Sequence, residues 1–268
     1  MLKFVLSLVT ALFVAGSALA SPMSVLFVGD SLTYGTGASD TDGDGHPNGY
    51  VSILGEMWAP YGVEIINAGC GGATIRDWTN DGGESVSCAI WDAWGLLAEQ
   101  HLPVDGIHIS LGGNDAVGFF EWGCPHAGQW GGCWVPVDEY EERMRQLIEK
   151  IGEDVAILLS TTVPNPNANS MHNARLEGYR EVVMRIAGED EWDNIYFGAD
   201  MLHQLSLEFF PGGQVHPNDE GHALIAEILA PRISAIVPEP STFLLVAMGL
   251  IGLRLSRGST RLKTGHRR

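Results

Sequence analysis

The sequence predicts an α/β fold: a parallel sheet covered by helices on both faces. Five short apolar segments alternate with helical segments along the chain, the pattern of repeated βαβ units. The first segment, Val25–Val28, is continuously apolar, as in strands buried on both faces. It runs into Gly29-Asp30-Ser31, which places a serine hydroxyl at the carboxyl end of a strand. Open α/β sheets bind their ligands at that end.

The other elements follow in chain order. Further strands are expected at residues 62–67, 106–111, 155–160 and 194–197. Apolar residues at helical spacing predict helices at 49–58, 89–101, 137–151, 173–187 and 223–236. Consecutive parallel strands end on one edge of the sheet. The turns after the first three strands, which carry Ser31, the glycines of 69–72 and Asn114, are therefore expected to converge there.

Both ends of the chain are predicted to lie outside this fold. Residues 1–20 combine Lys3, an apolar run and Ala18-Leu19-Ala20, the pattern of a secretory signal peptide with its cleavage site. At the other end, Pro238-Glu239-Pro240 precedes an apolar run, Phe243–Leu253, and an arginine-rich tail. We therefore expect a signal peptide over 1–20, one domain over 21–237, and a sorting segment over 238–268.

The carboxyl-terminal segment resembles the PEP-CTERM sorting signal of Gram-negative bacteria in its motif, spacing and order of charge. The resemblance implies export, an exosortase-type processing enzyme as partner and a transient inner-membrane anchor. The product would reside in the periplasm, at the cell surface or outside the cell. With its polar neighbours, the apolar run is just long enough to span a bilayer, and the basic tail would stay cytoplasmic. A plain tail anchor is the alternative.

The amino-acid composition limits the kinds of partner that the protein is expected to bind. The chain has 15 Lys and Arg against 33 Asp and Glu, a net charge of −18. Six of the basic residues lie in the tail, so the domain itself is still more acidic and is not expected to bind nucleic acid or anionic membrane surfaces. An even number of cysteines in an exported chain indicates disulfides. Of three possible pairings, their positions favour Cys70–Cys88 and Cys124–Cys133.

Two loops are open to more than one interpretation. Residues 40–45 match the first half of a calcium-binding loop, but Val51 occupies the position where such a loop needs a glutamate. A solvated acidic loop is the default interpretation, and no metal or cofactor is expected in the reaction. The insertion at 116–134 holds five aromatic residues. It is interpreted either as a surface that stacks on sugar rings or as a disulfide-pinned flap.

The polar residues at the strand ends suit nucleophilic catalysis. A serine hydroxyl is a weak nucleophile until a base takes its proton, and histidine suits that role near neutral pH. His216 lies in His216-Pro217-Asn218, just before the last helix. The backbone N–H groups of Ser31 and Gly72 and the side-chain amide of Asn114 are donors of the kind that stabilises an oxyanion.

Four of these segments resemble the sequence blocks of the SGNH (GDSL-type) esterase/lipase family. They are Gly29-Asp30-Ser31-Leu32, the Asn67–Gly72 block, Gly112-Gly113-Asn114-Asp115 and His216-Pro217-Asn218. The resemblance implies a flavodoxin-like three-layer α/β/α sandwich with a five-stranded sheet. It also implies a catalytic pair, Ser31 and His216, an oxyanion hole of Ser31, Gly72 and Asn114, and ester hydrolysis through an acyl-enzyme. The Gly49-Tyr50 step after the first block resembles the corresponding step in carbohydrate acetylesterases of this clan. Together with the sorting signal, this resemblance suggests O-acetyl groups on polysaccharide as the substrate.

One position departs from the family pattern. The family has an aspartate three residues before the catalytic histidine, and Gly213 stands there in this chain. A backbone carbonyl, Glu208 or Asp200 would then orient His216. The alternative is a catalytically weakened surface protein of the same fold that binds glycans. A long-chain lipase is disfavoured because no long apolar lid is visible.

Overall fold

The computed structural model describes residues 23–41, 43, 45–79, 104–117 and 134–237. The predicted signal peptide, the helix at 89–101, most of the aromatic insertion and the carboxyl-terminal sorting segment lie outside these residues.

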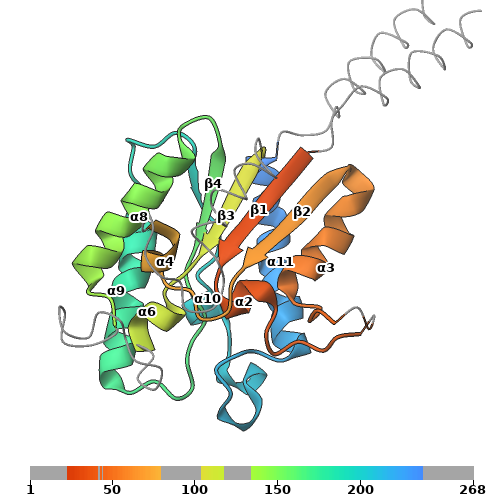
Figure 1. Ribbon diagram of the computed structural model, residues 1–268, viewed down its shortest axis with the longest axis vertical. Coiled ribbons are helices and arrows are strands. Elements are labelled where there is room, and N and C mark those ends of the chain that lie inside the picture. Colours follow the sequence, from red (N-terminus) through yellow and green to blue (C-terminus); the bar gives the residue numbers. More distant parts are fainter. Residues whose placement is uncertain (1–22, 42, 44, 80–103, 118–133, 238–268) are drawn as a thin grey trace, which may run out of the picture.

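The described residues form a five-stranded parallel sheet in the order β2-β1-β3-β4-β5 (Figure 1). The strands are β1 (Met23–Gly29), β2 (Val63–Gly69), β3 (Gly106–Ser110), β4 (Ala156–Ser160) and β5 (Ile195–Phe197). All five lie where the sequence predicts strands. Gly29 is in register with Gly69 of β2 and with Ser110 of β3, so these three strands end at the same level. The expected convergence of their following turns is thereby confirmed.

Helices cover both faces of the sheet, which confirms the three-layer sandwich (Figure 1). Leu26 and Val28 point to the face that packs against α4 (Ile75–Thr79), α8 (Val137–Ile151) and α9 (Ser170–Ile186). Val25 and Phe27 point to the face that packs against α3 (Tyr50–Trp58) and α11 (Asp219–Ile236). This alternation along β1 is the period-two pattern of a strand buried on both sides.

Two helices begin earlier than their apolar patterns predict, because side chains cap their amino-terminal ends. The Asn169 side chain accepts from the N–H groups of Met171 and His172 at the start of α9. The Asn218 side chain accepts from the N–H of Gly221 at the start of α11. Such caps satisfy donors that the helix leaves unpaired, so helical structure begins in the polar residues before the apolar ones.

Short elements gather at the carboxyl edge of the sheet. There α2 (Ser31–Tyr34), α6 (Gly113–Val117) and α10 (Met201–Gln204) follow β1, β3 and β5 (Figure 1). Single 3-10 turns are η1 (Ala59–Tyr61), η2 (Leu207–Phe209) and η3 (Pro211–Gly213). The last two lie in the segment that leads to His216.

Several predictions concern residues that are only partly described. Among the described residues, none of the helices combines the length and apolar character needed to cross a membrane. The predicted membrane segment, 243–253, lies outside them. Cys70 is disulfide-bonded, but the other three cysteines lie outside the described residues, so the pairing stays a prediction. The Asp40 carboxylate accepts from the N–H groups of Gly43 and Gly45, while Asp42 and Asp44 are not described.

Candidate active site

The serine is held at a sharp transition from strand to helix. Asp30 is buried and caps α2 by accepting from the N–H of Leu32 at 2.9 Å. Burial raises the pKa of its carboxyl to about 6. Gly29 is required at this point, because a Cβ there would overlap the side chain of Thr33. Ser31 therefore stands as the first residue of a helix at the carboxyl edge of the sheet.

Buried polar groups support this turn from behind. The Thr33 hydroxyl is 2.9 Å from the Tyr50 hydroxyl, and both residues are fully buried. His222 accepts from the N–H of Tyr50 through Nδ1 at 3.3 Å and donates from Nε2 to the carbonyl of Thr36 at 3.2 Å. These two bonds require a neutral ring, and burial lowers the pKa of His222 accordingly. His222 thus holds the chain just after the serine.

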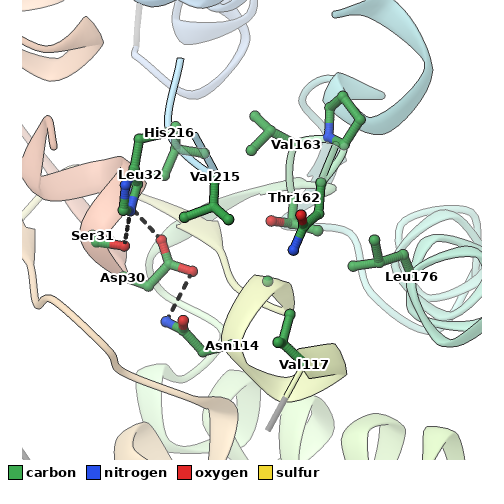
Figure 2. A pocket seen from close by; sticks show the side chains of 13 residues that line it. Asp30, Ser31, Leu32, Asn114, Val117, Thr162, Val163, Leu176, Val215 and His216 are labelled. Atoms are coloured by element: carbon green, nitrogen blue, oxygen red, sulfur yellow. Dashed lines mark hydrogen bonds between the residues drawn. The ribbon is translucent and has the colours of Figure 1, made fainter. Parts of the chain in front are cut away.

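His216 reaches the serine hydroxyl directly. Its Nε2 lies 2.8 Å from Ser31 Oγ (Figure 2). The loop beneath it is tightly packed, since a Cβ on Gly37 would lie 2.9 Å from the Cβ of His216 and 2.3 Å from the carbonyl of Pro217. Burial lowers the pKa of His216 below its ordinary 6.5. The ring is therefore neutral at pH 7 and can accept the hydroxyl proton.

No carboxylate among the described residues forms a hydrogen bond or ion pair with His216. Of the two sequence candidates, Asp200 is bound by Arg180 at 2.7 Å, and Glu208 lies exposed in η2. Gly213, at the family's aspartate position, is exposed with a φ of +74°. Its carbonyl accepts from the side-chain amide of Asn167. The structure thus places neither candidate acid against the histidine.

The predicted oxyanion donors come from the turns after β2 and β3. The Asn114 amide nitrogen donates to the carbonyl of Ala73 at 2.9 Å, and lies 3.5 Å from the carboxylate of Asp30. The bond to Ala73 fixes the amide and occupies one of its two hydrogens. The contact with Asp30 is long, so the second hydrogen is available to an incoming oxygen. Gly72 has a φ of +81° in a turn closed by the N–H of Ala73 and the carbonyl of Cys70.

A cavity of about 200 Å³ opens beside the serine and histidine (Figure 2). Ser31, Asn114 and His216 line it, whereas Gly72 does not. Its other walls are largely apolar, formed by Val117, Val163, Pro164, Leu176 and Val215 with Thr162 and Asn165. Sequence reasoning missed these wall residues. Thr162 and Val163 lie two and three residues after the end of β4, and their place beyond a strand end is the signal that marks them.

A parallel α/β/α sandwich with a histidine on a strand-end serine is the arrangement of a serine hydrolase. A family model described as GDSL-like Lipase/Acylhydrolase matches residues 27–224. The chain belongs to this GDSL-like lipase/acylhydrolase family and is a hydrolase of ester bonds. A second model, described as the PEP-CTERM protein-sorting motif, matches residues 237–258 and indicates sorting for export in Gram-negative bacteria. Both resemblances noted in the sequence are confirmed.

Individual relatives agree with this assignment. An acetylxylan esterase from Geobacillus stearothermophilus is 24% identical over 226 residues, which cover 78% of this chain and 92% of the relative. The crystal structure of a catalytic mutant of an acetylxylan esterase from the same organism has a TM-score of 0.56, with 24% identity and coverage of 81% and 96%. An aryl esterase from M. smegmatis has a TM-score of 0.57 at 17% identity, with coverage of 80% and 100%. The structural likenesses show that the fold is shared.

Proposed function

We propose that this protein is an exported serine esterase that removes small acyl groups, O-acetyl groups on a polysaccharide in particular, through an acyl-enzyme. The observation that carries the proposal is the 2.8 Å contact between His216 Nε2 and Ser31 Oγ. The catalytic domain is residues 21–237, and residues 238–268 would anchor it until an exosortase-type enzyme processes it.

The two side chains act in sequence on one proton. His216 Nε2 takes the proton of the Ser31 hydroxyl as Oγ bonds to the ester carbonyl carbon. The same proton then passes to the leaving alcohol as the carbon–oxygen bond of the ester breaks, which leaves an acyl-enzyme. Water attacks that intermediate, gives a proton to His216 and releases the acid, after which the proton returns to Ser31.

Three donors would stabilise the negative charge on the carbonyl oxygen. Ser31 is the first residue of α2, so its N–H has no acceptor within the helix. The Asn114 amide lies on the cavity wall, and the Gly72 N–H would complete the set. One such donor is typically worth about 10²–10³ in turnover.

The absence of a carboxylate at His216 among the described residues implies a modest turnover. An orienting acid fixes the tautomer of the histidine and stabilises the imidazolium that forms, and its loss can lower turnover about 10⁴-fold. In this protein the ring of His216 would be oriented by its burial and by its contact with the Gly37 loop. The protein is therefore proposed to be a slow esterase rather than an inactive binding protein.

The cavity and the relatives favour a short acyl group. A space of about 200 Å³ with largely apolar walls suits an acetyl group better than a long chain. A relative that covers 78% of this chain is named acetylxylan esterase. The sorting motif supports export, and an exported esterase would meet acetylated glycans outside the cytoplasm.

The proposal is tested by assaying the full chain on acetylated xylan and on p-nitrophenyl acetate, butyrate and octanoate. The wild type should release acetate and prefer the acetyl ester, and Ser31→Ala should lower kcat by about 10²-fold or more, since the loss of the serine does not add to that of the orienting acid. Ser234→Ala is the matched control, because Ser234 is exposed on α11 and its hydroxyl donates to the carbonyl of Pro231. Wild-type protein that binds acetylated xylan without hydrolysing any ester would instead support the glycan-binding alternative.

A further inference from the structure

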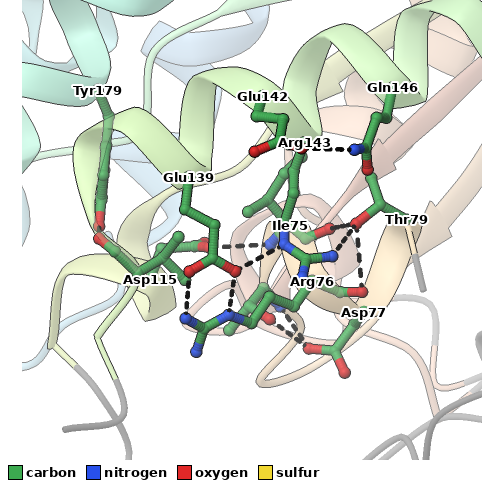
Figure 3. A network of polar contacts seen from close by, with 12 residues as sticks. Ile75, Arg76, Asp77, Thr79, Asp115, Glu139, Glu142, Arg143, Gln146 and Tyr179 are labelled. Atoms are coloured by element: carbon green, nitrogen blue, oxygen red, sulfur yellow. Dashed lines mark hydrogen bonds and ion pairs between the residues drawn. The ribbon is translucent and has the colours of Figure 1, made fainter. Parts of the chain in front are cut away.

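One buried carboxyl takes no part in the proposed chemistry. Asp115 directly follows Asn114 in α6 and is fully buried. Its Oδ1 accepts from the N–H of Ile75, the first residue of α4, at 2.9 Å (Figure 3). Its Oδ2 has no hydrogen-bond partner among the described residues. An unpartnered buried oxygen is costly, so its retention calls for a reason.

The surroundings of Asp115 favour a neutral carboxyl. Within the described part of the chain no cation forms an ion pair with it, and the nearby hydroxyls of Tyr140 and Tyr179 donate to the carbonyls of Leu111 and Val135 instead. Burial, with the negative charges of Asp30 and Asp77, raises the pKa of Asp115 to about 7. A neutral acid costs much less to bury unpaired than a carboxylate does.

Asp115 and its neighbour Asn114 bind the same short stretch of backbone. Asn114 donates to the carbonyl of Ala73, and Asp115 accepts from the N–H of Ile75. Thr74, between them, is held separately by Asp77, which accepts from its N–H and its hydroxyl at 2.7 Å each. Residues 73–75 lead directly out of the turn that contains Gly72.

The helix that follows has its own attachment. Arg76 forms a bidentate ion pair with Glu139 of α8, at 2.6 and 2.8 Å, and Arg143 binds the same carboxylate at 2.7 Å (Figure 3). Arg143 also donates to the hydroxyl of Thr79. Loss of the Asp115 bond would therefore leave α4 docked on α8 and would loosen mainly the turn before it.

We infer that Asp115 is a positioning residue that holds the Gly72 turn and the Asn114 amide in the arrangement that an oxyanion needs. This inference rests on the proposed esterase function. The bond to Ile75 needs only an acceptor, and a neutral one suffices, so asparagine should replace Asp115 where alanine cannot. The turn acts on the transition state, so its loosening should lower kcat and leave KM nearly unchanged.

The test uses the full chain and p-nitrophenyl acetate. Asp115→Asn should keep kcat within about threefold of wild type, whereas Asp115→Ala should lower it roughly 10- to 100-fold, less than the loss of a whole donor. Asp77→Ala removes a partly buried carboxylate that holds Thr74, and it should also lower kcat. This variant provides the test if Asp115→Ala fails to fold. Asp105→Ala is the matched control: Asp105 accepts from the N–H of Ser24 at 2.7 Å, at the amino-terminal edge of the sheet.

The outcomes separate this inference from the proposed function. The positioning role would be overturned if Asp115→Ala folds and keeps wild-type kcat, or if Asp115→Asn is as impaired as Asp115→Ala. In either case the proposed function would stand as long as Ser31→Ala is inactive. If Asp115→Ala does not fold, wild-type kcat in Asp77→Ala would overturn it. If Ser31→Ala retains full activity, the proposed function itself fails.

Discussion

The two halves of the candidate catalytic pair are built very differently. The serine follows six consecutive buried residues, 25–30, and is capped by Asp30. The histidine follows five consecutive exposed residues, 211–215, of which two are glycines with positive φ. The contrast shows that the sheet fixes the nucleophile, while the base depends on its few contacts with the nucleophile turn.

Contacts at the end of the histidine loop compensate for its exposure. The N–H of Asn218 donates to the carbonyl of Phe209 at 2.8 Å, and the Asn218 side chain caps α11. The next residue, Asp219, accepts from the N–H and hydroxyl of Ser39, at 2.6 and 2.8 Å. These bonds hold the residues just after His216, whose ring no described carboxylate orients.

The largest effect is expected from removing the base. His216→Ala should lower kcat about 10²–10⁴-fold, because general-base assistance is worth that much. His203→Ala is the matched control, since His203 is exposed and its ring pairs with Glu177, at 2.7 Å, rather than with Ser31. Initial rates on p-nitrophenyl acetate provide the measurement. Equal rates for His216→Ala and the wild type would remove His216 from the mechanism.

A smaller effect is expected from restoring an acid. Gly213→Asp should raise kcat up to about tenfold, a small part of what an orienting carboxylate is worth. Of the residues that the structure describes, only the Asn167 side chain, at 3.4 Å, lies near a Cβ on Gly213, but the positive φ should cost about 1–2 kcal/mol of stability. Gly212→Asp is the matched control. Gly212 has a φ of +65° and open space around it, so an aspartate there carries the same backbone strain one residue away from the family's acid position.

The pH dependence sharpens the same comparison. Catalysis needs a neutral His216, and burial holds its pKa below 6.5, so the acidic limb of wild-type kcat/KM should lie below pH 6.5. A carboxylate beside the ring stabilises the imidazolium and should move that limb upward in Gly213→Asp. A wild-type limb above pH 6.5 would indicate that an acid already faces His216.

The smallest effect concerns the support behind the serine. Tyr50→Phe removes the partner of the buried Thr33 hydroxyl and should lower the free energy of unfolding by about 1–2 kcal/mol. Gln214→Ala, in the exposed histidine loop, should change it by less than about 0.5 kcal/mol. Urea unfolding of both variants gives the comparison. Equal losses would show that the two regions do not differ in rigidity.

The sequence was sufficient to predict the elements whose physics is local. The continuous apolar run of Val25–Val28, followed by a turn, predicts a buried strand that ends at Ser31. The contact between His216 and Ser31 was inferred from a resemblance, and the geometry agrees with it. Both inferences rest on short motifs, one at the end of a strand and one just before the last helix.

Contacts between segments remote in the chain were not predictable in this way. Asp115 accepts from the N–H of Ile75, forty residues away, and nothing in its local sequence shows that one of its oxygens lacks a partner among the described residues. The cavity walls after β4 and on α9 depend on how those elements pack. The family pattern predicts an acid near His216. That neither Asp200 nor Glu208 supplies it is seen only from their positions in the structure.

The most direct test of the Ser31–His216 pair is covalent labelling by a serine-directed organophosphonate, read by intact mass and peptide mapping. The wild type should gain one adduct on the peptide that contains Ser31, Ser31→Ala should gain none, and His216→Ala should react much more slowly. An adduct that persists in Ser31→Ala, or a wild type that hydrolyses esters without becoming labelled, would contradict the account.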